Sequence, residues 1–228
     1  MRTFETDVQL LKYRVLKAVA KRAYEGTLME SYYEIPKLIS PGPKPTMRCC
    51  VYKERAIVQE RVRLAMGGDR RNPNIIEVIE IACDECPVER YMVSESCRGC
   101  ISQRCIKTCP KQAISKKNGK AHIDFDLCIE CGRCAKVCPY GAITEHVRPC
   151  ERSCKVGAIH MNEEKKAEIN PEKCISCGAC SYACPFGAIM DKSFMVDAIN
   201  IIRNKKENYK TVAIVAPAIA AQFDGVTL

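Results

Sequence analysis

Eighteen of the 228 residues are cysteine, and most of them belong to one repeated pattern. Four segments begin with Cys-x3-Cys and end, eight and nine residues after their first cysteine, in Ala-Ile; they start at Cys105, Cys134, Cys150 and Cys180. The spacing pairs the first segment with the second and the third with the fourth, and each pair encloses a similar joining segment, residues 120–128 or 166–174. Two copies of one small module account for this periodicity.

Each module is expected to contain a short hairpin followed by cysteine-bearing turns and helices. In the first module, residues 113–114 and 121–123 are expected to form two short strands. Between them lies Asn118-Gly119, a step that favours a tight turn. Residues 162–165 take the same place in the second module. Modules this small bury little apolar surface, so something other than hydrophobic burial must hold them together.

The termini and hydropathy indicate a cytoplasmic chain without a membrane span. Residues 1–7 contain no apolar core and no cleavage site, so they do not form a secretory signal. No run approaches the roughly 18 uninterrupted apolar residues of a membrane-spanning helix. In a reducing compartment dense cysteine indicates bound metal rather than disulfides.

Two full runs of Cys-x2-Cys-x2-Cys-x3-Cys-Pro are typical of bacterial [4Fe-4S] sites. Three of the thiolates lie on one tight turn around one cluster, and the fourth points away and ligates the neighbouring cluster. Gly132 and Gly178 are expected to let the backbone approach the cluster. Zinc is the alternative, but zinc sites usually take two ligand pairs, often with histidine. The three histidines, His122, His146 and His160, stand at no ligand spacing and are expected on the surface.

If the fourth cysteine of each run ligates the neighbouring cluster, twelve cysteines are assigned to three clusters. The opening run of the first module has two extra residues between its second and third cysteines but keeps the fourth cysteine and its proline. The predicted ligands are Cys97, Cys100, Cys105 and Cys138 for cluster 1; Cys128, Cys131, Cys134 and Cys109 for cluster 2; and Cys174, Cys177, Cys180 and Cys154 for cluster 3.

Two cysteines of the second module, Cys150 and Cys184, are left without partners. Upstream, Cys83 and Cys86 have the spacing of the two ligands that the second module lacks. The hypothesis is that these four cysteines hold cluster 4. In the alternative interpretation, the upstream pair consists of buried thiols or half of a zinc site. The adjacent Cys49-Cys50 is interpreted as a packing pair without a ligand role.

The flanking regions are expected to be mainly helical. Helices are predicted within residues 5–30 and at about residues 52–66, the second ending at Gly67-Gly68, with a break at the proline-rich residues 40–45. The charged residues of the second helix, including Glu54 and Arg61, are expected to be solvated. A further amphipathic helix is predicted at residues 194–203, and a buried strand of an α/β type at residues 211–217.

The cysteine runs resemble those of two-cluster bacterial ferredoxins over residues 97–189. The wider chain is similar to the amino-terminal part of the group B, monomeric [FeFe]-hydrogenases, on the strength of residues 48–55, 65–69 and 212–218. The resemblance implies that the clusters carry electrons to and from a six-iron H-cluster. The cysteines that would hold that H-cluster have no counterpart here, so the chain alone is expected not to be catalytic. It would be a fragment of a hydrogenase or a split relative.

The expected fold is therefore α+β, with tandem ferredoxin-like ββα cluster-binding modules. A helical region (residues 1–82) precedes the electron-transfer domain (83–192, with modules at 97–143 and 150–189). Residues 193–228 would form a linker helix and the first strand of a truncated α/β domain.

The expected function is electron transfer through three to four [4Fe-4S] clusters. The partner would be a redox protein or the missing catalytic hydrogenase domain. A stand-alone polyferredoxin-type subunit of another redox complex is an alternative. A regulatory or nucleic-acid-binding iron–sulfur or zinc protein is a third, motivated by the formal net charge of +9. No helix-turn-helix or zinc-finger spacing supports nucleic acid as a partner. An oxidised cubane with four thiolates carries roughly −2, so four clusters would offset most of the basic excess.

Overall fold

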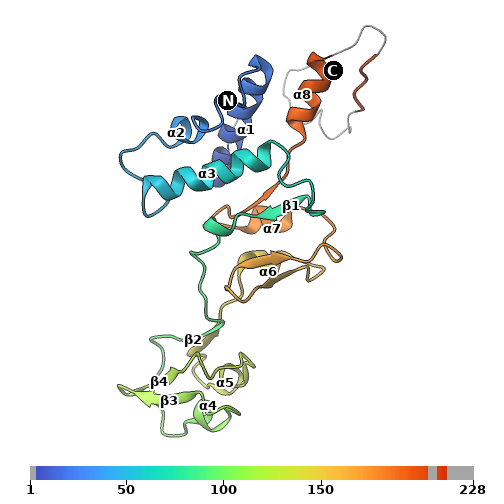
Figure 1. Ribbon diagram of the computed structural model, residues 1–228. Coiled ribbons are helices and arrows are strands. Elements are labelled where there is room, and N and C mark those ends of the chain that lie inside the picture. The colour runs from blue at the N-terminus through green and yellow to red at the C-terminus, as the bar shows by residue number, and fades with distance from the viewer. Residues whose placement is uncertain (1–3, 205–209, 215–228) are drawn as a thin grey trace. The chain divides into compact units, whose positions relative to one another are not determined.

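A computed structural model of the chain describes residues 4–204 and 210–214 (Figure 1). The chain divides into two compact units, one made of residues 1–71 and 192–228 and the other of residues 72–191. In the part of the chain that the structure describes, no helix combines the length and the hydrophobicity needed to cross a bilayer.

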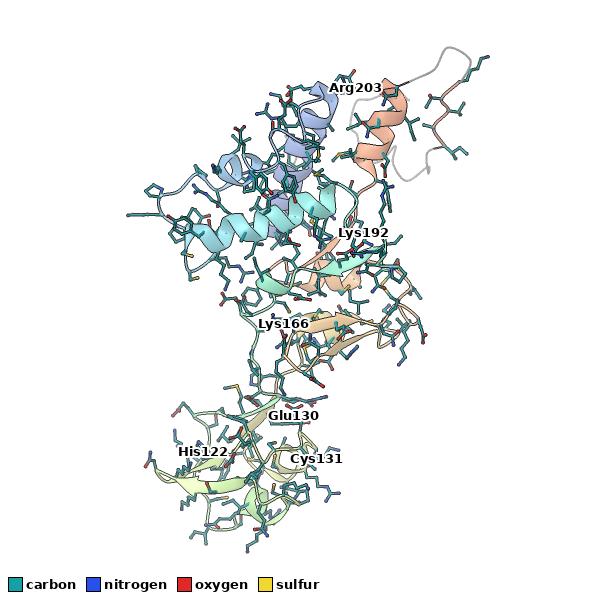
Figure 2. The ribbon with its side chains drawn as sticks, viewed as in Figure 1. His122, Glu130, Cys131, Lys166, Lys192 and Arg203 are labelled. Carbon is teal, nitrogen blue, oxygen red and sulfur yellow. The ribbon has the colours of Figure 1, made fainter. Side chains whose placement is uncertain are left out.

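The described residues of the first unit form the helices α1 (Asp7–Glu25), α2 (Ile35–Ile39), α3 (Val51–Ala65) and α8 (Met195–Arg203). The Thr6 side chain caps α1 by accepting a hydrogen bond from the Gln9 N–H, and Gly26 ends the helix with a φ of 80°. Helix α1 packs against both α3 and α8. The Arg203 guanidinium at the end of α8 donates to the Ala23 carbonyl at 2.9 Å (Figure 2), where a cation complements the carboxyl end of α1.

The apolar stripes of α1 and α3 form the core of this unit, as the sequence predicts. The buried side chains include Leu11, Val15, Val19, Ile57, Val58, Val62 and Ala65. Helix α3 ends before Gly67 and Gly68, which adopt φ angles of 111° and 64°. Both predicted amino-terminal helices are therefore confirmed, as is the helix predicted at residues 194–203.

The expectation of a fully solvated charged face on α3 is wrong for Glu54 and Arg61, each only 2% exposed. The Glu54 carboxylate accepts hydrogen bonds from the Ser40 hydroxyl (2.6 Å) and from the backbone N–H groups of Thr46, Met47 and Arg48. Burial alone would raise the pKa of Glu54, but these donors outweigh it and lower the pKa. Through these hydrogen bonds, the buried carboxylate holds residues 40–48, which precede α3, against the helix.

The second unit contains two similar modules, each with a hairpin and a pair of strands from its two ends. In the first module the hairpin joins β3 (Ile114–Lys117) to β4 (Lys120–Ile123), and β2 (Tyr91–Val93) pairs antiparallel with β5 (Ile143–Glu145). Asn118 and Gly119 adopt φ angles of 48° and 78°, which is the tight turn that the sequence predicts. The short helices α4 (Arg104–Lys107) and α5 (Arg133–Val137) carry cysteines.

The second module repeats this plan with elements from two separate parts of the sequence. Its hairpin joins β6 (Ile159–Met161) to β7 (Ala167–Ile169), and its helices are α6 (Pro149–Ser153) and α7 (Ala179–Ala183). The strand β1 (Ile76–Val78), followed by the 3-10 turn η1 (Glu80–Ala82), pairs antiparallel with β8 (Ile189–Asp191) (Figure 1). The second module therefore begins before the first one and ends after it.

The sequence predicts two modules in tandem, and the strand pairing differs from that prediction. The first module is inserted into the second, between Cys86 and Pro149, because β1 completes the sheet of β8. The compact unit consequently begins at residue 72, whereas the spacing of the cysteines led us to expect a boundary at residue 83.

The strand expected at residues 211–217 has no counterpart in the described part of that segment. Residues 210–214 have no regular secondary structure, and Val212 and Ile214 are 81% and 99% exposed. A strand forms only where neighbouring strands satisfy its backbone groups. Residues 215–217 lie outside the described residues.

Candidate iron–sulfur centres

The four cysteines predicted for cluster 1 line one cavity in the first module. Cys97 and Cys100 precede α4, Cys105 lies on α4, and Cys138 follows α5. All four face a hollow whose other walls include Ile106, Ala121 and Ala142. Burial raises the pKa of the Cys105 thiol, and the nearby thiols of Cys138 and Cys100 raise it further.

The four cysteines predicted for cluster 2 line a second cavity of the same module. Cys128 and Cys131 come from the turn into α5, Cys134 lies on α5, and Cys109 comes from the turn after α4. Cys134 is buried, which raises the pKa of its thiol, and the thiols of Cys128 and Cys131 contribute to the rise. Figure 2 shows Cys131 and its neighbour Glu130 on this turn.

In the second module the cysteines predicted for cluster 3 also lie together. Burial raises the pKa of the Cys180 thiol, and the thiols of Cys174 and Cys154 raise it further. Cys177 lies on the same turn, which enters α7 through Gly178, and its side chain is exposed. The turn has the same form as the one that carries three of the cysteines predicted for cluster 2 in the first module.

The cysteines predicted for cluster 4 meet although they come from three distant segments. Cys150 on α6 is 5% exposed and Cys184 after α7 is 7% exposed. Burial raises the pKa of the Cys150 thiol to about 11, and the thiols of Cys184, Cys83 and Cys86 add to the rise. A buried thiol with a raised pKa stays protonated until a metal displaces its proton, so Cys150 beside three further cysteines is suited to a metal centre.

Backbone N–H groups aimed at cysteine sulfur recur at equivalent places in both modules. The last cysteine of each Cys-x3-Cys segment accepts a hydrogen bond from the alanine four residues later: Ala113 to Cys109 (3.3 Å), Ala142 to Cys138 (3.4 Å), Ala158 to Cys154 (3.2 Å) and Ala188 to Cys184 (3.3 Å). Such donors stabilise the negative charge of a thiolate that ligates iron.

A further pair of these hydrogen bonds shows that Cys83 is the counterpart of Cys97. Ala121 on β4 donates to the Cys97 sulfur at 3.4 Å, and Ala167 on β7 donates to the Cys83 sulfur at 3.4 Å. Both alanines follow the lysine that begins the joining segment. The Cys-x2-Cys pair of Cys83 and Cys86, in the segment that follows β1, thus takes the place in the second module that Cys97 and Cys100 take in the first.

The buried Arg148 is a feature that sequence reasoning missed. Its side chain is 7% exposed; Nη1 donates to the Cys83 sulfur at 3.7 Å and Nη2 to the Lys165 carbonyl at 2.6 Å. The corresponding position of the first module, two residues before Cys105, holds Gln103. The one signal in the sequence is the position of Arg148 two residues before a predicted ligand cysteine. Its burial could not be predicted, because it depends on a contact with the distant hairpin.

The backbone conformation explains why glycine stands just before α5 and α7. Gly132 and Gly178 precede α5 and α7 with φ angles of 71° and 78°, which side-chain-bearing residues rarely adopt. At Gly132 an added Cβ would meet the Tyr91 hydroxyl at 2.4 Å, whereas nothing lies within 4 Å of one at Gly178.

Five residues outside the predicted ligand sets are also assigned roles from the sequence: Cys49, Cys50 and the three histidines. Cys49 is exposed, so the interpretation of Cys49-Cys50 as a packing pair is wrong for it; Cys50 caps α3, its sulfur accepting from the Lys53 N–H at 3.4 Å. The three histidines are exposed, as expected.

The geometry fits multi-iron clusters. Among residues 4–204 and 210–214, no three His, Cys, Asp or Glu side chains converge as the ligands of one ion. In a cubane each cysteine binds a different iron, so its sulfurs are spaced more widely. The all-cysteine donor sets, the lined cavities and the N–H donors to sulfur suit such clusters.

Comparison with known proteins identifies the two cysteine runs at residues 128–138 and 174–184. A family model described as a 4Fe-4S binding domain matches residues 121–144 and 167–190, and a second model of that description matches residues 180–208. An uncharacterized ferredoxin of Methanocaldococcus jannaschii is 47% identical over 47 residues, 21% of this chain and 28% of that protein. The electron transport protein HydN of Escherichia coli is 41% identical over 61 residues, 27% of this chain and 35% of that protein.

A shorter relative is covered more fully. The ferredoxin 7Fe of Hydrogenibacillus schlegelii is 40% identical over 53 residues, which are 23% of this chain and 68% of that protein. The chain spans only about a third of the length of the first two relatives.

Proposed function

Because the chain belongs to the ferredoxin family of 4Fe-4S electron-transfer proteins, we propose that its two nested modules hold four [4Fe-4S] clusters as one electron relay. Clusters 1 and 2 belong to the first module, and clusters 3 and 4 to the second. Each cluster takes its ligands from the set predicted for it. The chain's own cysteines then bind sixteen irons, about four for each cubane.

The observation that carries this proposal is the equivalence of Cys83 and Cys97. Each sulfur accepts a hydrogen bond from the alanine at the same place in its hairpin, at the same distance of 3.4 Å. Each belongs to a Cys-x2-Cys pair that follows the first strand of its module. The second module therefore has eight cysteines in the arrangement of the first, which is a complete two-cluster set.

The protein's part in the chemistry is to set how readily each centre accepts an electron. When bound, each cubane accepts and releases one electron. The alanine N–H groups point the positive ends of their dipoles at the ligand sulfurs. They therefore favour the reduced state of the cluster, which carries more negative charge. Burial of Cys134, Cys150, Cys180 and Cys184 keeps water from the inner side of the ligand sets and opposes added charge.

A continuous set of contacts supports an order for the relay. Glu130 lies between two ligands of cluster 2, and its carboxylate is 3.9 Å from the Lys165 ammonium. The Lys165 carbonyl accepts from Arg148, which also donates to Cys83 of cluster 4. Clusters 2 and 4 are therefore the proposed neighbours between the modules, which gives the order 1–2–4–3.

The relay's connection to a hydrogen-activating centre is a second, separate proposal. It rests on the resemblance of residues 48–55, 65–69 and 212–218 to the amino-terminal part of group B [FeFe]-hydrogenases. Expression together with the reading frame that adjoins this one, followed by an assay of hydrogen-dependent cluster reduction, tests it. Reduction by hydrogen supports the link, and an adjoining frame without further cysteine ligands contradicts it.

Anaerobic reconstitution tests the electron-transfer proposal itself. We expect about sixteen irons and as many acid-labile sulfides per chain, with EPR signals of reduced cubanes after treatment with dithionite. Bound zinc without sulfide would contradict the proposal. About twelve irons would remove cluster 4 and leave a three-cluster protein.

A further inference from the structure

The basic residues of the second unit are concentrated in the first module. Between Cys97 and Ile123 the chain contains seven lysines and arginines and no aspartate or glutamate. Residues 97–140 hold nine basic and three acidic residues, whereas residues 149–191 of the second module hold five basic and six acidic ones. The two modules share one fold and one ligand plan, so the fold does not account for this difference.

Compensation of the clusters' own charge does not account for it either. Both modules would carry two cubanes of roughly −2 each, so compensation alone would make the two modules equally basic. With clusters bound, the first module instead stays positive and the second becomes negative. An excess of one sign on one face is a feature that steers an oppositely charged partner.

Three of these basic residues line the predicted site of cluster 1. Arg98, Arg104 and Lys116 line the same cavity as its four cysteines, and all three side chains are exposed. Two apolar side chains accompany them: Ile101, next to Cys100, is 96% exposed, and Tyr140, which lines the cavity, is 58% exposed. We name these residues, together with Lys107 on α4, the cluster 1 face.

We propose that the cluster 1 face is the docking surface for an acidic electron-transfer protein, and that electrons enter or leave the relay there. The proposal rests on the proposed function and names its partner by charge. One electron passes between the partner's redox group and cluster 1, so that one is oxidised as the other is reduced. The exposed Ile101 and Tyr140 supply the apolar contact and the surrounding cations supply orientation and encounter rate.

A charge-reversal pair with a matched control tests the proposal in the full, reconstituted chain. The test variant is Arg104→Glu with Lys107→Glu. The control is Arg152→Glu with Lys155→Glu, the same change of charge at exposed positions of the second module, where Arg152 is the repeat equivalent of Lys107. The probe is a strongly acidic two-[4Fe-4S] ferredoxin, reduced beforehand, and stopped-flow absorbance follows electron transfer without oxygen at increasing salt.

The test variant is expected to lower the second-order rate constant at low salt at least about tenfold and to flatten its salt dependence. The control variant should stay within about twofold of the parent. Equal loss in both variants, or no loss in the first, would overturn the proposal. Retention of duplex DNA by the parent, lost in the test variant while its electron-transfer rate is unchanged, would assign the face to nucleic acid instead.

Iron and sulfide counts separate this proposal from the proposed function. If the parent binds no sulfide, the relay itself fails. If parent and variants all bind equal amounts of iron and sulfide while their rates do not differ, only the docking surface fails.

Discussion

At the scale of single residues, Arg148 distinguishes the second module from the first. It is a buried cation in hydrogen-bonding contact with Cys83, where the first module has Gln103. A fixed positive charge beside a ligand sulfur stabilises the reduced cluster more than the oxidised one. Cluster 4 should therefore have a higher reduction potential than cluster 1, its counterpart.

Replacement of this cation tests that difference. Arg148→Met removes the charge while keeping an unbranched apolar stem, and should lower the potential of cluster 4. A tenfold change in its ratio of reduced to oxidised forms corresponds to about 59 mV for one electron. EPR-monitored potentiometric titration measures the shift. Arg152→Met, at an exposed arginine of the same module, is the control, and an unchanged potential in Arg148→Met at full iron content would contradict the role.

The two cluster-turn glycines provide a second test at this scale. Gly132→Ala and Gly178→Ala both force alanine into a left-handed φ, at a cost of about 1–2 kcal/mol. Only Gly132→Ala also meets Tyr91, so it should be the less stable variant and should lose iron from cluster 2 first. Thermal bleaching of the cluster absorbance ranks the two. Tyr91→Phe, which removes the clashing hydroxyl, should restore part of the stability; equal stability of the two alanine variants would count against this account.

At the scale of elements, the loop of residues 40–50 depends on the buried carboxylate of α3. The pKa of Glu54 is lowered by its donors, so its contribution to stability is present above the pKa of an unfolded glutamate, roughly 4.3, and is lost as the pH falls through the lower folded value. Glu54→Gln cannot satisfy the same four donors, since the amide replaces one acceptor oxygen by a donor.

Glu54→Gln should therefore lower the free energy of unfolding at pH 7 by about 1–3 kcal/mol. The difference from the parent should shrink at pH values below roughly 4.3. Urea denaturation, followed by far-ultraviolet circular dichroism at pH 7 and at a pH below roughly 4.3, measures this difference in the free energy of unfolding. Glu60→Gln, at a partly exposed residue paired with Arg63, is the control. A pH-independent difference would show that the carboxylate's charge is not the cause.

At the scale of the whole molecule, the sequence predicted features that depend on neighbouring residues, but it did not predict those that depend on the pairing of distant segments. Cys-x3-Cys spacing, the Asn118-Gly119 turn and the apolar stripes of α1 and α3 are properties of neighbouring residues, and the structure has each of them where the sequence places it. The nesting of the modules depends on β1 meeting β8, which no short-range pattern encodes. The burial of Glu54 and Arg148 was missed for the same reason, since their hydrogen-bond partners come from separate loops.

The nested arrangement itself has a consequence for assembly. Residues 87–149 separate Cys86 from Cys150, so folding of the first module reduces the entropy that is lost when the four predicted ligands of cluster 4 are brought together. The pairing of β2 with β5 brings the two ends of the first module together. We therefore propose that Cys83 belongs to a fourth cluster built in this way.

Iron and sulfide analysis of Cys83→Ser tests that claim most directly, with Cys49→Ser as a control that removes a thiol outside every predicted set. The reconstituted parent and Cys49→Ser should each bind about sixteen irons, and Cys83→Ser about twelve, with the EPR signal of one cluster missing. About sixteen irons and four intact cubanes in Cys83→Ser would contradict the account.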